Sequence, residues 1–142
     1  GGELQEVVLL DVTPHSLGVR VTGDRMSVVI PANTSNPCRN KKVFATTEDN
    51  QDFVAIEIYQ GENEYASKNR RLGRFVLSDL TRAMRGRTKV EVSFTMDADG
   101  ILEVTAVEVG TGRASAVIIE ASSGLTQDEI KALAARQSRS SL

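Results

Sequence analysis

Few side chains in this sequence are of the types that perform nucleophilic catalysis. His15 is the only histidine, Ser16 follows it directly, and Cys38 is the only cysteine. A catalytic serine or cysteine needs a base within hydrogen-bonding reach, and neighbours in sequence seldom point at one another in that way. We therefore predict a structural or surface imidazole at His15, an inert thiol at Cys38 and no enzymatic activity in this chain.

Two short segments have the residue types of ion-binding or phosphate-binding loops. Asp97, Asp99 and Gly100 resemble the middle of a calcium loop, but the spacing of such a loop places its bidentate acid at Ala106. The run Gly110-Thr111-Gly112 lacks a following helix, whose N-terminus would complete a phosphate site. We predict turns at both segments and no metal site.

The composition is that of one ordinary globular domain. The 142 residues are 40% hydrophobic and 25% charged, as is usual for a folded protein, and no apolar run approaches the ~20 residues of a membrane-spanning helix. The net charge of −2 comes without a basic stripe, so neither nucleic acid nor a membrane is an expected partner. No secretory signal pattern opens the sequence, and a single cysteine excludes an internal disulfide, so we expect a cytoplasmic location.

Short β-branched segments that alternate in polarity dominate the sequence from Val19 to Ala121. The clearest cover residues 53–59, 89–95, 101–107 and 115–121, with turn-forming Gly, Asn and Asp between them. Such segments with short connections are typical of antiparallel sandwiches and barrels. We therefore predict a mainly β domain over residues 13–123.

The pattern changes at Gly124. Thr126 and Glu129 have the spacing of a capping box at a helix start, and Leu125 and Ile130 have that of the accompanying hydrophobic staple. Apolar residues then recur at helical spacing for only a few positions. We predict a short C-terminal helix and a tail over residues 124–142.

The first apolar segment is unusual for a soluble domain. Val7, Val8, Leu9 and Leu10 stand in a row before Asp11. One interpretation is a strand buried on both faces. The other is a linker that docks on a partner domain, since each fully buried Val or Leu contributes about 1.5–3 kcal/mol.

Several motifs along the chain, taken together, point to one protein family. The first are Val8-Leu9-Leu10-Asp11-Val12-Thr13-Pro14, Ser16-Leu17-Gly18, a variant Ile-x-x-Asn-Thr at residues 30–34, Val43-Phe44 with Thr46, and Glu48-Asp49-Asn50-Gln51. The later ones are Gln60-Gly61-Glu62, Leu72-Gly73-Arg74-Phe75, Arg85-Gly86, Asp97-Ala98-Asp99-Gly100-Ile101-Leu102 and Ala121-Ser122-Ser123-Gly124-Leu125. Over residues 2–131 the chain resembles the substrate-binding domain of the DnaK-type seventy-kilodalton heat-shock chaperones.

The resemblance implies a two-sheet antiparallel β-sandwich whose loops hold an extended peptide under a helical lid. An apolar pocket for one peptide side chain would be lined by Val19, Val21, Phe44, Val54, Ile56 and Val90. Ala45 and Gln51 would contact the peptide main chain, and Thr22 and Thr47 would bridge over it. Without the resemblance, the apolar positions would be assigned to ordinary core.

The resemblance also implies roles outside the pocket. Residues 1–12, with Val7, Val8, Leu9, Leu10 and Asp11, would be the remnant of an interdomain linker, and Asp49 and Arg85 would face the lid. The full-length protein would carry an ATPase domain that uses ATP and Mg, with a J-domain cochaperone and a nucleotide exchange factor as partners. This part of it would need no cofactor.

Three hypotheses about function follow. The first is a chaperone fragment that binds extended, Leu-containing segments of unfolded proteins under the control of an ATPase domain absent from the chain. The second is an adaptor for one partner, which Thr22 and Thr47 keep open because the family commonly has a larger side chain and an alanine there. The third, an unrelated β-sandwich hydrolase, lacks catalytic groups. We also expect self-association through residues 7–10 or through the tail at residues 136–142.

Overall fold

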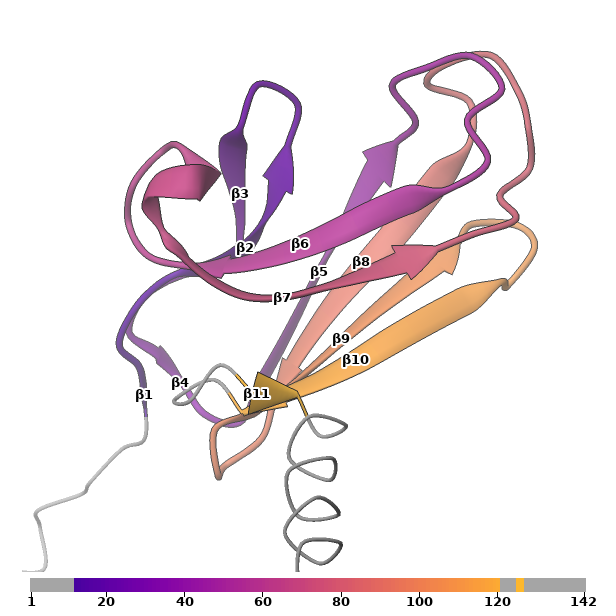
Figure 1. The fold of residues 1–142 in the computed structure, drawn as a ribbon. Helices are drawn as coiled ribbons and strands as arrows, with labels where there is room; N and C mark the ends of the chain where they lie inside the picture. Colours follow the sequence, from indigo (N-terminus) through magenta and orange to yellow (C-terminus); the bar gives the residue numbers. More distant parts are fainter. Residues whose placement is uncertain (1–11, 121–124, 127–142) are drawn as a thin grey trace, which may run out of the picture.

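The computed structural model describes residues 12–120 and 125–126, which are mainly β-strand (Figure 1). The strands are β1 (Val12–Thr13), β2 (Leu17–Val21), β3 (Arg25–Ile30), β4 (Thr34–Ser35), β5 (Cys38–Ala45), β6 (Val54–Gln60), β7 (Arg70–Leu77), β8 (Lys89–Met96), β9 (Ile101–Glu108), β10 (Ala114–Glu120) and β11 (Leu125–Thr126). A 3₁₀ turn, η2 (Ala66–Lys68), lies between β6 and β7. The four strands predicted from the sequence correspond to β6, β8, β9 and β10 within one residue at each end.

Two larger sheets contain most of the strands, and every pairing in them is antiparallel. The four-stranded sheet has the order β3-β2-β6-β7, and the five-stranded sheet has the order β11-β10-β9-β8-β5. Figure 1 shows the first stacked above the second, while β1 and β4 form a separate two-stranded ribbon. The predicted mainly β, antiparallel architecture is confirmed.

Strand β8 shows how alternation in the sequence builds the core. Val90, Val92, Phe94 and Met96 are each 3% exposed or less, while Glu91 between the first two is only partly buried. Side chains at every second position of a strand share a face, so these four point at the opposite sheet. The residues that join them in one cluster from the four-stranded sheet are Leu17, Val19, Val29, Ile30, Ile56, Ile58, Leu72 and Leu77.

Both edge strands of the four-stranded sheet contain one extra residue, and the two irregularities lie at the same level. Val29 is extra in β3, where the pairing with β2 shifts register next to Gly18. Leu72 is extra in β7, where the pairing with β6 shifts next to Tyr59. Gly18 and Tyr59 are themselves paired between the two central strands. A bulge bends its strand and increases the local twist, so both edges of this sheet are curved.

Gly18 is required by this arrangement. A Cβ atom there would overlap the carbonyl oxygen of Ser27 on β3, so the close approach of β2 and β3 beside the bulge depends on the missing side chain.

Side chains connect the two sheets along the flank formed by β3 and β5. Asn40 Nδ2 donates to the carbonyl oxygen of Val29 at 2.9 Å, and Lys42 Nζ donates to Ser27 Oγ at 3.1 Å. The carbonyl of the extra residue in β3 is therefore satisfied by the opposite sheet. On the other flank β7 lies against β10.

Several sequence-based predictions lie outside the described residues. These are the linker residues Val7, Val8, Leu9, Leu10 and Asp11, the helix and tail after Thr126, and the two segments expected to mediate self-association. Within residues 125–126 the chain pairs as a short strand with β10. No helix among the described residues has the length and apolar character needed to cross a membrane.

Candidate functional site

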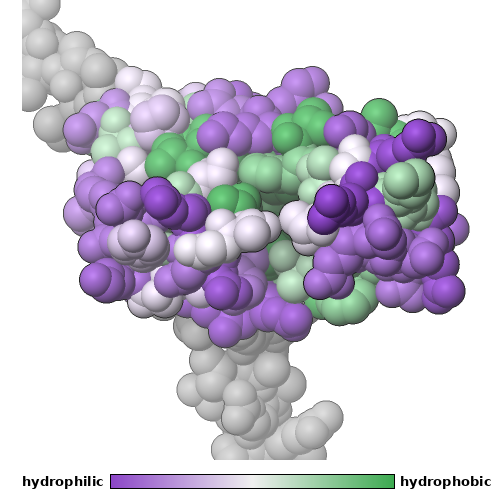
Figure 2. Space-filling model, turned by 90° about the horizontal axis from the view of Figure 1, so that it is seen from above, coloured by the Kyte–Doolittle hydropathy of each residue, from purple (hydrophilic) through white to green (hydrophobic). Residues whose placement is uncertain are grey.

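A pocket of about 380 Å³ opens where β2 and β5 end and β6 begins. Seen from above, hydrophobic surface gathers along the middle of this face between hydrophilic rims, and the surface is hollowed there (Figure 2). The pocket is lined by all ten residues that were predicted to contact a peptide: Val19, Val21, Thr22, Phe44, Ala45, Thr47, Gln51, Val54, Ile56 and Val90. The structure thus brings the predicted residues together, and their contact with a peptide stays a prediction.

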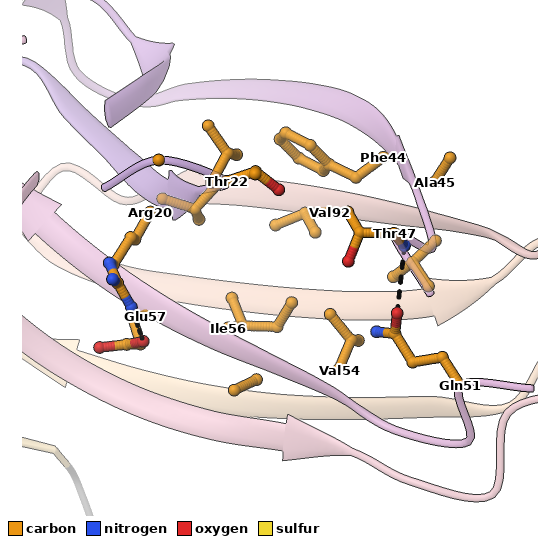
Figure 3. Close-up of a pocket in the computed structure, with 15 residues that line it drawn as sticks. Arg20, Thr22, Phe44, Ala45, Thr47, Gln51, Val54, Ile56, Glu57 and Val92 are labelled. Atoms are coloured by element: carbon orange, nitrogen blue, oxygen red, sulfur yellow. Dashed lines mark hydrogen bonds and ion pairs between the residues drawn. The ribbon is translucent and has the colours of Figure 1, made fainter. Parts of the chain in front are cut away.

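The floor of the pocket is apolar and comes from both sheets. Val19, Ile56 and Val90 are 3–5% exposed, while Phe44 and Val54 are partly buried and pack on the same core cluster. Figure 3 shows Phe44, Val54 and Ile56 around one space. The pocket is therefore an extension of the core that lacks a covering side chain at one end.

Gln51 shapes the loop between β5 and β6. Its side-chain oxygen accepts the backbone N–H of Thr47 at 3.1 Å (Figure 3) and of Glu48 at 3.3 Å, and its Nε2 donates to the carbonyl of Phe53 at 2.9 Å. We expected this side chain to contact a peptide main chain. In the structure it closes the loop that holds Thr47 at the rim of the pocket.

Two loops at this end of the molecule are joined by backbone hydrogen bonds. The β5–β6 loop and the β7–β8 loop lie side by side (Figure 1), where Asn50 N–H donates to the carbonyl of Ala83 at 2.8 Å and Gly86 N–H donates to that of Thr46 at 2.7 Å. Asp49 Oδ1 accepts the backbone N–H of Arg85 at 2.9 Å. The two residues predicted to face a lid are thus in contact, while the lid-facing role remains untested.

A buried carboxylate anchors the β7–β8 loop. Glu108 is 3% exposed, and its two oxygens accept the backbone N–H of Thr81 at 2.9 Å and the Thr81 hydroxyl at 2.6 Å. The bond from the Thr81 hydroxyl, more than any other cause, holds the pKa of Glu108 below its ordinary value, against the opposing effect of burial. Glu108 therefore stays ionised near neutral pH and fixes the start of this loop.

Charged side chains form one end of the pocket. Arg20 Nη1 lies 3.4 Å from Glu57 Oε2 (Figure 3), and Arg20 Nε lies 3.0 Å from Asp24 Oδ1. The hydrogen bond to Asp24 is the main reason that the pKa of Arg20 is raised. Ser67 donates to Asp24 from its hydroxyl and its backbone N–H, and the hydroxyl bond chiefly lowers the pKa of Asp24. This network connects η2 to the turn that contains Thr22.

The residues considered for nucleophilic catalysis are not arranged for it. Ser16 Oγ donates to Glu62 Oε1 at 2.7 Å and accepts the backbone N–H of Ala32 at 3.1 Å. His15 lies beside Glu62, with Nδ1 3.6 Å from Oε2. The hydroxyl of Ser16 is thus directed at a carboxylate, so the imidazole does not activate it. Burial raises the pKa of the Cys38 thiol, opposite to the change that makes a cysteine nucleophilic.

The segment considered for calcium is a hairpin turn between β8 and β9. Asp97 Oδ1 accepts the backbone N–H groups of Asp99 at 2.8 Å and Ile101 at 2.9 Å, and Gly100 has a φ of +81°, which favours glycine. The described residues contain no cluster of three or more His, Cys, Asp or Glu side chains that could hold a metal ion. The Asp97 carboxylate serves the turn.

Comparison with known proteins decides the family. The family model described as "Hsp70 protein" matches residues 1–141. The chain belongs to the Hsp70 family. It is also 45% identical over 130 residues to the "Chaperone protein DnaK" of Psychrobacter cryohalolentis, an alignment that covers 92% of this chain and 20% of that relative. The chain therefore spans about one fifth of the length of this Hsp70 relative, and the resemblance to DnaK-type chaperones is confirmed at the level of the family.

The structure adds pocket residues that sequence reasoning missed in this Hsp70 chain. They are Arg20, Gly23, Ala55, Glu57 and Val92. Val92 continues the alternation that begins at Val90, so its position in β8 was available in the sequence. Arg20 and Glu57 are charged residues within apolar strands. This pattern predicts that their side chains point away from the core, but it does not predict which residues lie next to them.

Proposed function

We propose that this chain is the substrate-binding β-domain of an Hsp70-type chaperone and that it holds extended hydrophobic segments of unfolded proteins. The observation that carries the proposal is the apolar pocket that the ten predicted residues line at the loop end of the sandwich. Its volume of about 380 Å³ is at the lower end of the ~300–1,000 Å³ usual for ligand sites. This size suits one or two aliphatic side chains of a longer chain.

The chemistry of the pocket supports a preference for Leu-like side chains with little other selection. An extended peptide that passes Ala45 and Thr47 at the end of β5 gains main-chain hydrogen bonds, which are independent of its sequence, and a pocket adds selection at one position. The floor formed by Val19, Ile56 and Val90 is nearly fully buried. A leucine that becomes buried there contributes about 1.5–3 kcal/mol, which corresponds to roughly 10- to 100-fold in affinity.

Control of the site in the complete protein is part of the proposal. We infer an ATPase domain elsewhere in the full-length protein that uses ATP and Mg, with residues 7–11 as the link to it. A J-domain cochaperone and a nucleotide exchange factor would act on that domain, in the cytoplasm. The part of the protein described in the structure would bind peptide without a cofactor and without catalysis. The greater length of the DnaK relative is consistent with this division. No observation favours the alternative of a dedicated adaptor.

Peptide binding tests the proposal directly. We expect fluorescence anisotropy to show micromolar binding of short peptides with a central leucine and little binding of all-polar peptides. Val54→Phe would fill the pocket and should weaken the leucine peptides about 10- to 100-fold. Val43→Phe is the matched control, because Val43 is 56% exposed on β5 and does not line the pocket.

Two results would count against the proposal. If no leucine peptide binds while the circular dichroism spectrum shows a folded β-protein, the chain is not a general peptide binder, and the adaptor hypothesis gains support. If Val54→Phe and Val43→Phe leave the affinity equally unchanged, the peptide site lies elsewhere.

A further inference from the structure

Charged side chains stand at one end of an otherwise uncharged pocket. Among the described residues that line it, the charged ones are Arg20 on β2 and Glu57 on β6. The Arg20 side chain is 45% exposed, whereas those of Glu57 and Asp24 are 21% and 30% exposed. The cation is therefore the most accessible charge of this group.

The carboxylates of the group are already engaged. Glu57 Oε1 accepts the Tyr59 hydroxyl at 3.3 Å, and its Oε2 faces Arg20. One oxygen of Asp24 accepts Arg20 Nε and the backbone N–H of Ser67, and the other accepts the Ser67 hydroxyl. Each oxygen thus has at least one donor within the described part of the chain.

The guanidinium retains unused donors. Arg20 Nε donates to Asp24, and Nη1 donates to Glu57. A guanidinium has five N–H donors, and no hydrogen bond joins Nη2 to another residue in the ranges that the structure describes. The two ion pairs also hold the long side chain in one place, so that less conformational entropy is lost when a ligand binds. Arg20 is a pre-positioned donor beside the apolar floor.

We propose that Arg20 is a specificity-determining residue that selects peptides with a carboxylate side chain next to the hydrophobic anchor. This inference rests on the proposed function and specifies the class of peptide for the same site: an aspartate or glutamate adjacent to a Leu-like residue.

The net charge of the group favours the opposite preference. Arg20, Glu57 and Asp24 together carry a net charge of −1, which favours a cationic peptide residue. At a separation of ~8 Å, about one Debye length at physiological salt, this effect is about two- to threefold in water and is reduced further by salt. A direct charge-assisted hydrogen bond to the free Nη2 donors gives up to about fivefold. The contact at Arg20 therefore outweighs the field of the group.

Labelled nonapeptides with one central leucine would test the inference. Glutamate, glutamine and lysine are placed in turn at each position within two residues of the leucine, and binding is measured by fluorescence anisotropy. At one or two positions the wild-type chain should bind the glutamate peptide about fivefold more tightly than the lysine peptide. In Arg20→Gln this ratio should fall to one or invert, because Glu57 and Asp24 remain.

Two further variants make the test specific. Arg39→Gln removes an exposed arginine on β5 that does not line the pocket, and it should leave the ratio unchanged. Glu57→Gln weakens one partner of Arg20 and should increase the preference for glutamate, which keeps the inference testable if Arg20→Gln does not fold.

The outcomes separate this inference from the proposed function. The role of Arg20 is overturned if the wild-type chain binds glutamate and lysine peptides equally well. It is also overturned if the ratio of these two affinities is the same in wild type and Arg20→Gln. Either result leaves peptide binding intact. A wild-type preference for lysine also overturns it. Failure of every leucine peptide to bind instead refutes the proposed function.

Discussion

The buried carboxylate of Glu108 provides a quantitative test of how the loops beside the pocket are held. In Glu108→Gln the amide can accept the Thr81 N–H and donate to the Thr81 hydroxyl oxygen, so both bonds persist without the charge. Hydrogen bonds to charged groups contribute about 1.5–3 kcal/mol and neutral ones about 0.5–1.5 kcal/mol. Over the two bonds this difference is about 2–3 kcal/mol, and the cost of burying the charge offsets about half of it, so we expect Glu108→Gln to lower the free energy of unfolding by about 1–1.5 kcal/mol at pH 7. Glu108→Ala should cost about 3 kcal/mol, because it removes both bonds to Thr81 and leaves a void where a buried side chain stood.

The pH dependence of this difference has a definite sign. Because the pKa of Glu108 is lowered in the folded protein, its ionised form contributes stability above the unfolded pKa of about 4.3. That contribution is lost as the pH falls through the lower folded pKa. Below this window wild type should approach Glu108→Gln in stability. Asp24 and Glu62 also have lowered pKa values, but they affect both proteins equally, so the difference reports on Glu108.

Urea unfolding followed by circular dichroism measures the effect. With an m-value of about 2 kcal/mol/M, Glu108→Gln should lower the midpoint by about 0.5–0.7 M at pH 7 and by much less at pH 3. Glu103→Gln, on an exposed position of the same strand, is the control and should change little. Equal midpoints of wild type and Glu108→Gln at pH 7 would refute the reasoning, as would a gap that does not depend on pH.

Three other variants or reactions test separate features. Gly18→Ala should lower the melting temperature by about 5–10 °C, because its Cβ meets the Ser27 carbonyl and overpacking costs about 1–3 kcal/mol; an unchanged melting curve contradicts the tight β2–β3 approach. Gln51→Ala should weaken leucine peptides about three- to tenfold in anisotropy titrations and shift the melting temperature by less than about 2 °C, since it loosens one loop; unchanged affinity would show that the loop is held without it. Cys38 should react with a disulfide reagent at pH 8 more than about tenfold more slowly than glutathione, since its thiol pKa is raised; a rate equal to that of glutathione contradicts this.

The strands could be predicted because their signal is local. In β8 the buried apolar residues Val90, Val92, Phe94 and Met96 stand at every second position, and turn residues mark both ends, so length and type follow from the sequence. The bulges at Val29 and Leu72 could not be predicted in this way. Both are buried apolar residues, as residues at regular core positions of a strand are, and the extra residue is recognised only when the neighbouring strands are paired.

The pocket could not be distinguished from core by pattern alone. Val90 lines the pocket and Phe94 is fully buried, yet they occupy equivalent positions in the same alternation. The difference lies in what the opposite sheet and the loops place above each of them. The family resemblance supplied that information for the ten predicted residues.

Long-range polar contacts explain the remaining gaps. The burial of Glu108 depends on Thr81, 27 positions away in sequence, and the place of Arg20 depends on Glu57, 37 positions away. Gln51 is a different case, since its partners are within four residues. Its loop-closing role follows from the turn geometry of that segment, which composition does not specify.

The curved edges of the four-stranded sheet bear on how this domain avoids edge-to-edge aggregation. A straight, unpaired strand edge presents backbone N–H and C=O groups that can pair with another chain, and such pairing leads to aggregation. Here β3 and β7 bend at their extra residues, and the outermost strand of the other sheet carries Arg39, Lys41 and Lys42. The bent edge strands and the positive charges on β5 both oppose the pairing of another chain with the sheet edges. If the domain binds unfolded polypeptides as proposed, these features would limit the growth of aggregates on the edges of its sheets.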